Sequence, residues 1–130
     1  MSAFRFAAVL SLLSTPVLAD EAWTSDMGQI VYEAEEGGAA IFSFTNVDAY
    51  PAKLIIPGLA GNYSDRSSHA AYWIGQGAGG CTAFMSHGDA PASSQWGRAQ
   101  VVFDSPEFPT SVTVILGFCL DEPNIVIRGE

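Results

Sequence analysis

The side chains best suited to catalysis in this chain are its two histidines, His69 and His87. The acids and hydroxyls closest to them in sequence are Asp65, Ser67, Ser68 and Asp89. A hydrolase triad needs a nucleophile, a base and an orienting acid brought together, and its serine is often found in a Gly-x-Ser-x-Gly turn. The chain contains no such turn, and clusters of Asp and Ser commonly satisfy the backbone of loops. We therefore expect no catalytic residue. The alternative is a small hydrolase or metal-dependent enzyme that uses His69, His87 and nearby carboxylates.

A metal site is also not predicted. His87 and Asp89 offer two ligand types two residues apart, but a stable zinc site needs three or four ligands. No second cysteine lies at zinc-ligand spacing from Cys81 or Cys119, and no Asp-x-Asn-x-Asp-Gly loop suggests calcium. The glycine-rich stretch 75–80 is not followed by the Lys-Ser or Lys-Thr of a phosphate loop. We therefore expect no cofactor.

Aromatic residues and an arginine are the candidates for binding: Tyr72, Trp73, Trp96 and Arg98. Tyr72 and Trp73 are neighbours in an expected strand, so their side chains point to opposite faces. Trp96 and Arg98 are two residues apart and share a face if their segment is extended. An exposed Trp beside an Arg can bind sugars, peptides or carboxylates. The alternative is that Trp96 belongs to the core and Arg98 lies across its ring.

The elements that must position these residues are short β-strands. Apolar runs broken by Gly, Pro, Asn and Asp recur every eight to twelve residues, which is typical of an all-β sandwich or barrel. Strands are expected at residues 29–35, 39–45, 52–56, 69–76, 95–104, 111–120 and 124–128. The prediction is a single small antiparallel β-barrel or β-sandwich of about eight short strands.

The clearest hairpin lies between residues 29 and 45. Its first strand alternates so that Ile30, Tyr32 and Ala34 share one face. A tight reversal at 36–38 leads into the second strand, where Phe42 and Phe44 share a face.

The segment around Trp23 gives a topological hint. Trp23, followed by Met27-Gly28 and a β run, is similar to the opening of lipocalin and avidin-like barrels, where an early Gly-x-Trp plugs one end. In this chain Ala22 directly precedes Trp23, and the glycine of the Gly-x-Trp pattern is absent. The resemblance implies an up-and-down barrel as one of the possible topologies.

Residues 1–19 have the pattern of a cleaved secretory signal peptide. Arg5 supplies the positive charge, residues 6–13 form a short apolar run, and Ala19 ends a small-residue cleavage pattern. Residues 20–130 are then a single exported domain, secreted or periplasmic, with no membrane span after cleavage. Oxidising compartments favour disulfides, so Cys81 is expected to pair with Cys119.

The chain is acidic, with a formal net charge of −9. Loss of Arg5 with the signal leaves 14 acidic side chains against four basic ones, a formal charge of −10. Nucleic acid is excluded as a partner because phosphate binding needs clustered Lys and Arg. Scattered acids favour solubility, and a partner with a basic surface is the functional alternative.

These observations together favour a non-catalytic binding or inhibitor-like module for an extracytoplasmic protein or glycan. A structural accessory protein of the cell envelope is a further alternative, and it would expose an uncovered apolar patch rather than a pocket.

Overall fold

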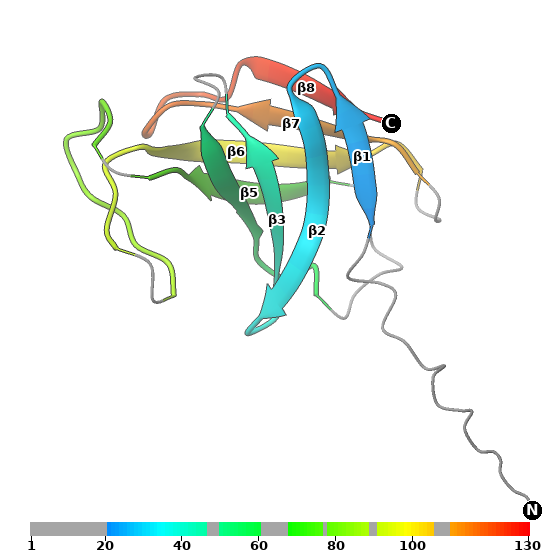
Figure 1. The fold of residues 1–130 in the computed structure, drawn as a ribbon, viewed down its shortest axis with the longest axis horizontal. Coiled ribbons are helices and arrows are strands. Elements are labelled where there is room, and N and C mark those ends of the chain that lie inside the picture. The colour runs from blue at the N-terminus through cyan, green and yellow to red at the C-terminus, as the bar shows by residue number, and fades with distance from the viewer. Residues whose placement is uncertain (1–20, 47–49, 61–67, 77, 89–90, 106–109) are drawn as a thin grey trace, which may run out of the picture.

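A computed structural model describes residues 21–46, 50–60, 68–76, 78–88, 91–105 and 110–130, so the predicted signal peptide at 1–19 lies outside the described residues. The described chain is all-β, and its eight antiparallel strands form one sheet in which each strand pairs with the next in sequence (Figure 1). The strands are β1 (Ala22–Ser25), β2 (Gly28–Glu36), β3 (Ala39–Thr45), β4 (Pro51–Ile56), β5 (Ser68–Ile74), β6 (Trp96–Phe103), β7 (Val112–Leu116) and β8 (Ile125–Gly129). Within these residues no helix has the length and apolar character needed to cross a bilayer.

The first and last strands curve toward each other and nearly close the sheet into a barrel. Thr24 of β1 donates its backbone N–H to the carbonyl oxygen of Glu130 at 2.9 Å, and Glu130 donates back to Thr24 at 3.0 Å. This pairing covers part of both edges, which would otherwise present unpaired backbone groups. The expected all-β fold is confirmed, and its up-and-down order is the topology that the resemblance of the Trp23 segment implied.

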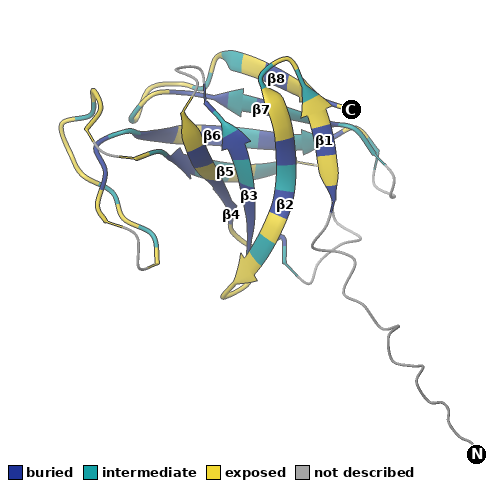
Figure 2. Ribbon diagram, viewed as in Figure 1, coloured by how far each residue is buried: buried dark blue, intermediate teal, exposed yellow. Residues whose placement is uncertain are grey.

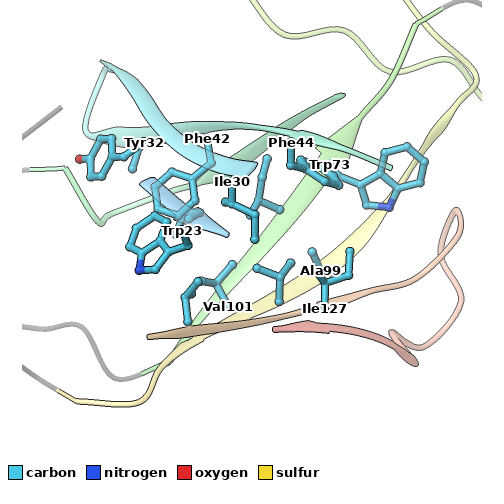
Figure 3. Close-up of a cluster of buried hydrophobic side chains, with 14 of the residues drawn as sticks. Trp23, Ile30, Tyr32, Phe42, Phe44, Trp73, Ala99, Val101 and Ile127 are labelled. Atoms are coloured by element: carbon cyan, nitrogen blue, oxygen red, sulfur yellow. The ribbon is translucent and has the colours of Figure 1, made fainter. Parts of the chain in front are cut away.

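The interior of the barrel is filled by side chains that alternate along the strands (Figures 2 and 3). The rings of Trp23 and Phe42 lie 5.4 Å apart, and those of Tyr32 and Phe42 lie 5.0 Å apart. Phe42 and Phe44 both face this core, as their spacing predicts. Burying such rings removes large apolar surfaces from water and is the main source of stability in a domain of this size.

The hairpin of β2 and β3 is confirmed, but one of its predicted faces is wrong. Gly37 and Gly38 both have positive φ, at 58° and 87°, which suits a two-residue turn between strands. Between Tyr32 and Ala34 the register shifts by a β-bulge. Tyr32 therefore faces the interior while Ala34 packs outside, because a bulge adds one residue and reverses the alternation that follows it.

Most strand bounds differ from the prediction by one or two residues, but one strand is much shorter than predicted and one was not predicted. The expected strand 111–120 ends at Leu116, because Cys119 has a φ of 57° and the chain turns there. β1 is a strand that the sequence pattern did not predict, since only Trp23 of its four residues is both apolar and buried.

A second apolar cluster lies on the outside of the barrel. We call it the outer cluster, and its buried members are Ile41, Ile55, Ile74 and Trp96. Cys81 and Met85 from the connection between β5 and β6 pack against it, as does Cys119. This connection, the β5–β6 loop (residues 75–95), therefore covers an outer apolar face that the strands alone would leave in water.

The close approach of β6 to residue 117 requires glycine at position 97. A Cβ atom at Gly97 would lie 2.5 Å from Nε1 of Trp73 and closer still to the carbonyl oxygen of Gly117. We expect Gly97→Ala to lower the free energy of unfolding by about 1–3 kcal/mol, because backbone and a buried ring must move. Urea unfolding followed by tryptophan fluorescence measures this loss. Gly80→Ala is the control, since a Cβ there meets nothing within 4 Å, and an equal effect of both changes would contradict the prediction.

Candidate functional site

The predicted disulfide between Cys81 and Cys119 is confirmed, and it joins two loops at one end of the sheet. Cys81 belongs to the β5–β6 loop, and Cys119 belongs to the connection between β7 and β8. Their Cα atoms are 5.5 Å apart, although 38 positions separate them in the sequence. The bond therefore fixes two segments that the strand ladder leaves unpaired.

The connection between β7 and β8 begins with a tight turn, which we call the cysteine turn (residues 117–122). The backbone N–H of Asp121 donates to the carbonyl oxygen of Phe118 at 3.0 Å and closes the turn. Cys119 occupies the left-handed region with a φ of 57°, which non-glycine residues rarely adopt because of steric cost. Its N–H donates to Trp96 at 2.9 Å, and its carbonyl oxygen accepts from the N–H of Arg98 at 3.2 Å. β6 therefore holds this unfavourable conformation in place.

Arg98 also supports the cysteine turn through its side chain. The guanidinium donates from Nη1 to the carbonyl oxygen of Leu120 at 3.0 Å, while the residue remains exposed. Arg98 lies directly opposite Tyr72 in the pairing of β5 with β6. The structure thus brings these two predicted binding residues side by side on the outer face.

The two predicted binding tryptophans are both buried. Trp73 is 1% exposed within the inner core, and Trp96 is 7% exposed within the outer cluster. Each indole N–H holds a loop: Nε1 of Trp73 donates to Gly117 at 2.7 Å, and Nε1 of Trp96 donates to Ala83 at 2.9 Å. Trp96 and Arg98 share the outer face, as expected, but neither indole offers an exposed surface on which a sugar ring could stack.

Tyr72 and His87 form a second link between the β5–β6 loop and the sheet. The hydroxyl of Tyr72 lies 3.2 Å from Nδ1 of His87, and Nε2 of His87 lies 3.1 Å from Oε1 of Glu36. A neutral imidazole protonated at Nε2 satisfies both contacts, since Nε2 then donates to Glu36 while Nδ1 accepts from Tyr72. Burial raises the pKa of the Tyr72 hydroxyl above its ordinary value.

The two histidines do not come together. His69 lies in β5 with its ring 6.4 Å from that of Phe103, an inner-core residue. Successive residues of a strand face opposite sides, so His69 lies on the face of β5 opposite to Tyr72 and its partner His87. No group of three or more His, Cys, Asp or Glu side chains is placed to hold a metal within the described ranges. Asp65, Ser67 and Asp89 lie outside those ranges, and the hydroxyl of Ser68 accepts a hydrogen bond from Gln100 at 2.6 Å.

The joined loops carry exposed apolar side chains that the sequence analysis did not single out. Leu120 is 73% exposed, Phe84 is 67% exposed and Phe118 is 41% exposed. Phe118 and Leu120 flank the half-cystine Cys119 in the cysteine turn. The signal that could have revealed them is the Phe-Cys-Leu-Asp-Glu sequence, because a cysteine tied into a turn forces its neighbours outward. Assigning residues 111–120 to one strand concealed it.

A hollow of about 320 Å³ lies between the two loops. Its lining residues are Trp73, Gly79, Gly80, Cys81, Ser94, Gln95, Trp96, Phe118, Cys119 and Asp121. The hydroxyl of Ser94 accepts from the N–H of Gly79 at 2.7 Å and orders the glycine side of the hollow. The rings of Trp73 and Phe118 are nearly perpendicular, with their centroids 6.0 Å apart. The hollow is therefore formed by residues that the disulfide and the sheet hold in fixed positions.

Removing the disulfide should destabilise the domain strongly. A crosslink over 38 positions reduces the entropy of the unfolded chain by an amount worth roughly 4 kcal/mol on the chain-entropy model. We expect the double substitution Cys81→Ala and Cys119→Ala to lower the free energy of unfolding by about that amount, as measured in urea. Thr82→Ala, at an exposed neighbour, serves as the control. A change of stability no larger than that of the control would show that the bond contributes little.

The raised pKa of Tyr72 makes stability depend on alkaline pH. The stability contributed by its proton is complete below the ordinary tyrosine pKa of 10.0 and is lost as the pH rises from there through the raised value. We expect the urea midpoint of the wild type to fall above pH 10 more steeply than that of Tyr72→Phe. Tyr50→Phe, which removes an exposed hydroxyl, should keep the wild-type decline. Identical declines for wild type and Tyr72→Phe would refute this linkage.

Comparisons with known proteins assign no family to this arrangement. No protein-family model, curated protein or solved structure matches the chain. Its function has to be inferred from the contacts, burial and charges of the described residues.

Proposed function

We propose that the chain is an exported, non-catalytic binding or inhibitor-like module for an extracytoplasmic protein or glycan, and that the disulfide-joined loops form its binding surface. The observation that carries the proposal is the cysteine turn, which exposes Phe118 and Leu120 on a backbone fixed by the Cys81–Cys119 bond. Exposed apolar side chains on a backbone that is already ordered can be buried by a partner at a small entropic cost.

The rigidity of the turn supports a role in recognition. The disulfide, the backbone bonds to β6 and the guanidinium of Arg98 all act on residues 117–121. A surface that is already ordered loses little conformational entropy when a partner binds, so more of the contact energy remains as affinity.

The separation of the histidines supports a non-catalytic role. General acid–base chemistry needs its groups within hydrogen-bond reach of one substrate position. His69 faces the inner core, whereas His87 is engaged by Tyr72 and Glu36 on the outer face. The hydrolase alternative would therefore have to use one histidine without the other.

The alternative of a structural accessory protein is less well supported. Permanent complexes bury large and strongly apolar surfaces. The exposed large apolar side chains of the described residues are Tyr50, Phe84, Phe118, Leu120 and Val126. Only three of these lie on the joined loops, which is a set suited to a separable complex rather than a permanent one.

Arg98→Ala tests the proposal because this arginine orders the turn without belonging to a core. Loss of the guanidinium contact to Leu120 should weaken saturable binding to components of the extracytoplasmic fraction about tenfold, with unfolding changed by less than about 1 kcal/mol. Fluorescence anisotropy of the labelled exported protein, with unlabelled protein as competitor, gives the affinity. Protease or glycosidase treatment of the fraction then distinguishes a protein ligand from a glycan.

Arg128→Ala is the matched control. Arg128 is also exposed on the outer face, but it pairs with Asp104 at 3.2 Å and donates to Thr113 at 2.7 Å, away from the cysteine turn. It should leave binding unchanged. Absence of any saturable binding by the wild type, or equal losses in the two variants, would overturn the proposed function.

A further inference from the structure

We propose that the hollow beside the disulfide receives a Lys or Arg side chain of a basic protein, while Leu120 contacts the apolar surface next to it. This inference rests on the proposed binding function and names the partner's chemistry. Asp121 is the one residue with an ionisable side chain among those that line the hollow. It forms no ion pair with any cation in the described part of the chain.

Aromatic residues complete the environment for a cation. Trp73, Trp96 and Phe118 all line the hollow, but Phe118, 41% exposed, is the one of the three whose ring is open to a cation from solvent. Aromatic rings attract ammonium and guanidinium groups electrostatically, and more strongly where water is partly excluded. Among the residues that the structure describes, no Lys, Arg or His lines the hollow.

The charge of the whole chain favours the same kind of partner. The formal net charge is −9, which raises the encounter rate with a basic protein and lowers it with an acidic one. Glu122 lies next to Asp121 and lines a separate depression of about 300 Å³ together with Arg98. A basic partner centred on Asp121 would therefore have a second carboxylate one residue further along the chain.

The other occupants fit less well. A second copy of the chain carries the same negative charge, and its described Lys and Arg side chains are engaged: Lys53 by Glu33, Arg98 by Leu120 and Arg128 by Asp104. A neutral glycan carries no charge that Asp121 could attract, and the indoles of Trp73 and Trp96 are only 1% and 7% exposed for stacking. These occupants are outcomes that the experiment distinguishes.

The first test uses small probes, so that it does not depend on knowing the partner. Nα-acetyl-arginine methylamide is titrated into the ¹⁵N-labelled exported protein, and the neutral isostere Nα-acetyl-citrulline methylamide is titrated in parallel. We expect saturable shifts of the indole N–H signals of Trp73 and Trp96 and of the Gly79 and Gly80 amides with the arginine probe only. Asp121→Asn should weaken its binding about fivefold, and Asp26→Asn, at an exposed acid on a distant turn, should leave it unchanged.

Three results would overturn the inference in this titration: equal shifts with the citrulline probe, shifts confined to other parts of the sheet, or an unaltered affinity in Asp121→Asn.

Phe118→Leu keeps an apolar side chain but removes the ring, so it should weaken arginine binding without removing the cover over Trp73. Saturable shifts of the same signals by the neutral trisaccharide maltotriose would indicate a glycan site instead. Concentration-dependent dimerisation that Asp121→Asn abolishes would indicate a second copy.

The second test uses the extracytoplasmic binding assay described for Arg98→Ala. We expect Asp121→Asn to weaken binding about fivefold and to reduce its dependence on salt, because one ion pair is lost. If macromolecular binding persists unchanged in Asp121→Asn, this inference fails and the proposed function stands. If the arginine probe binds but no saturable macromolecular ligand exists, the proposed function fails, and the inferred protein partner fails with it.

Discussion

The hydrogen bond from the Trp73 indole to the carbonyl oxygen of Gly117 is the contact on which the arrangement of the loops depends. Trp73 is buried in the inner core, and a buried N–H without an acceptor is costly. The acceptor can approach to 2.7 Å only because Gly97, directly opposite Trp73 in β6, has no side chain. A requirement of the core therefore fixes where β7 ends and where the cysteine turn begins.

Once residue 117 is fixed, the rest of the surface follows from covalent and packing constraints. Cys119 lies two residues further on, against β6, and its bond to Cys81 brings in the β5–β6 loop. That loop covers the outer cluster with Cys81 and Met85, and the Tyr72–His87 contact secures its far side. Phe118 and Leu120 flank Cys119 in this turn, so their exposure results from the way the turn is held.

The sequence allows the strands to be predicted far better than the site. The alternation of apolar and polar residues predicts β3 with its observed bounds, because Phe42 and Phe44 lie on one buried face. It misplaces Ala34, since a β-bulge depends on the register of two strands and leaves no mark in one strand's pattern. It also extends β7 through Cys119, because a left-handed cysteine is held by contacts to β6 that are distant in sequence.

Residue type alone predicted binding by side chains that the structure uses to hold its own loops. Tryptophan is frequent both in cores and at binding surfaces, and in this chain Trp73 and Trp96 bind the molecule's own loops. Arg98 is exposed, as a binding residue should be, yet its guanidinium supports the backbone of Leu120.

The aromatic side chains that fill the barrel limit where this domain could bind a ligand. A barrel of eight strands has an interior just wide enough to be filled by side chains or to hold one small ligand, and here Trp23, Phe42 and Trp73 take that space. Binding under the proposed function would then use the outer face and the loops, whose backbone lies outside the eight strands. The Cys81–Cys119 bond joins two of these loops, so oxidation of the two thiols both stabilises the fold and shapes the hollow. Under the proposed function, stability and binding are coupled through one covalent bond, because the Cys81–Cys119 bond both crosslinks the chain and fixes the cysteine turn.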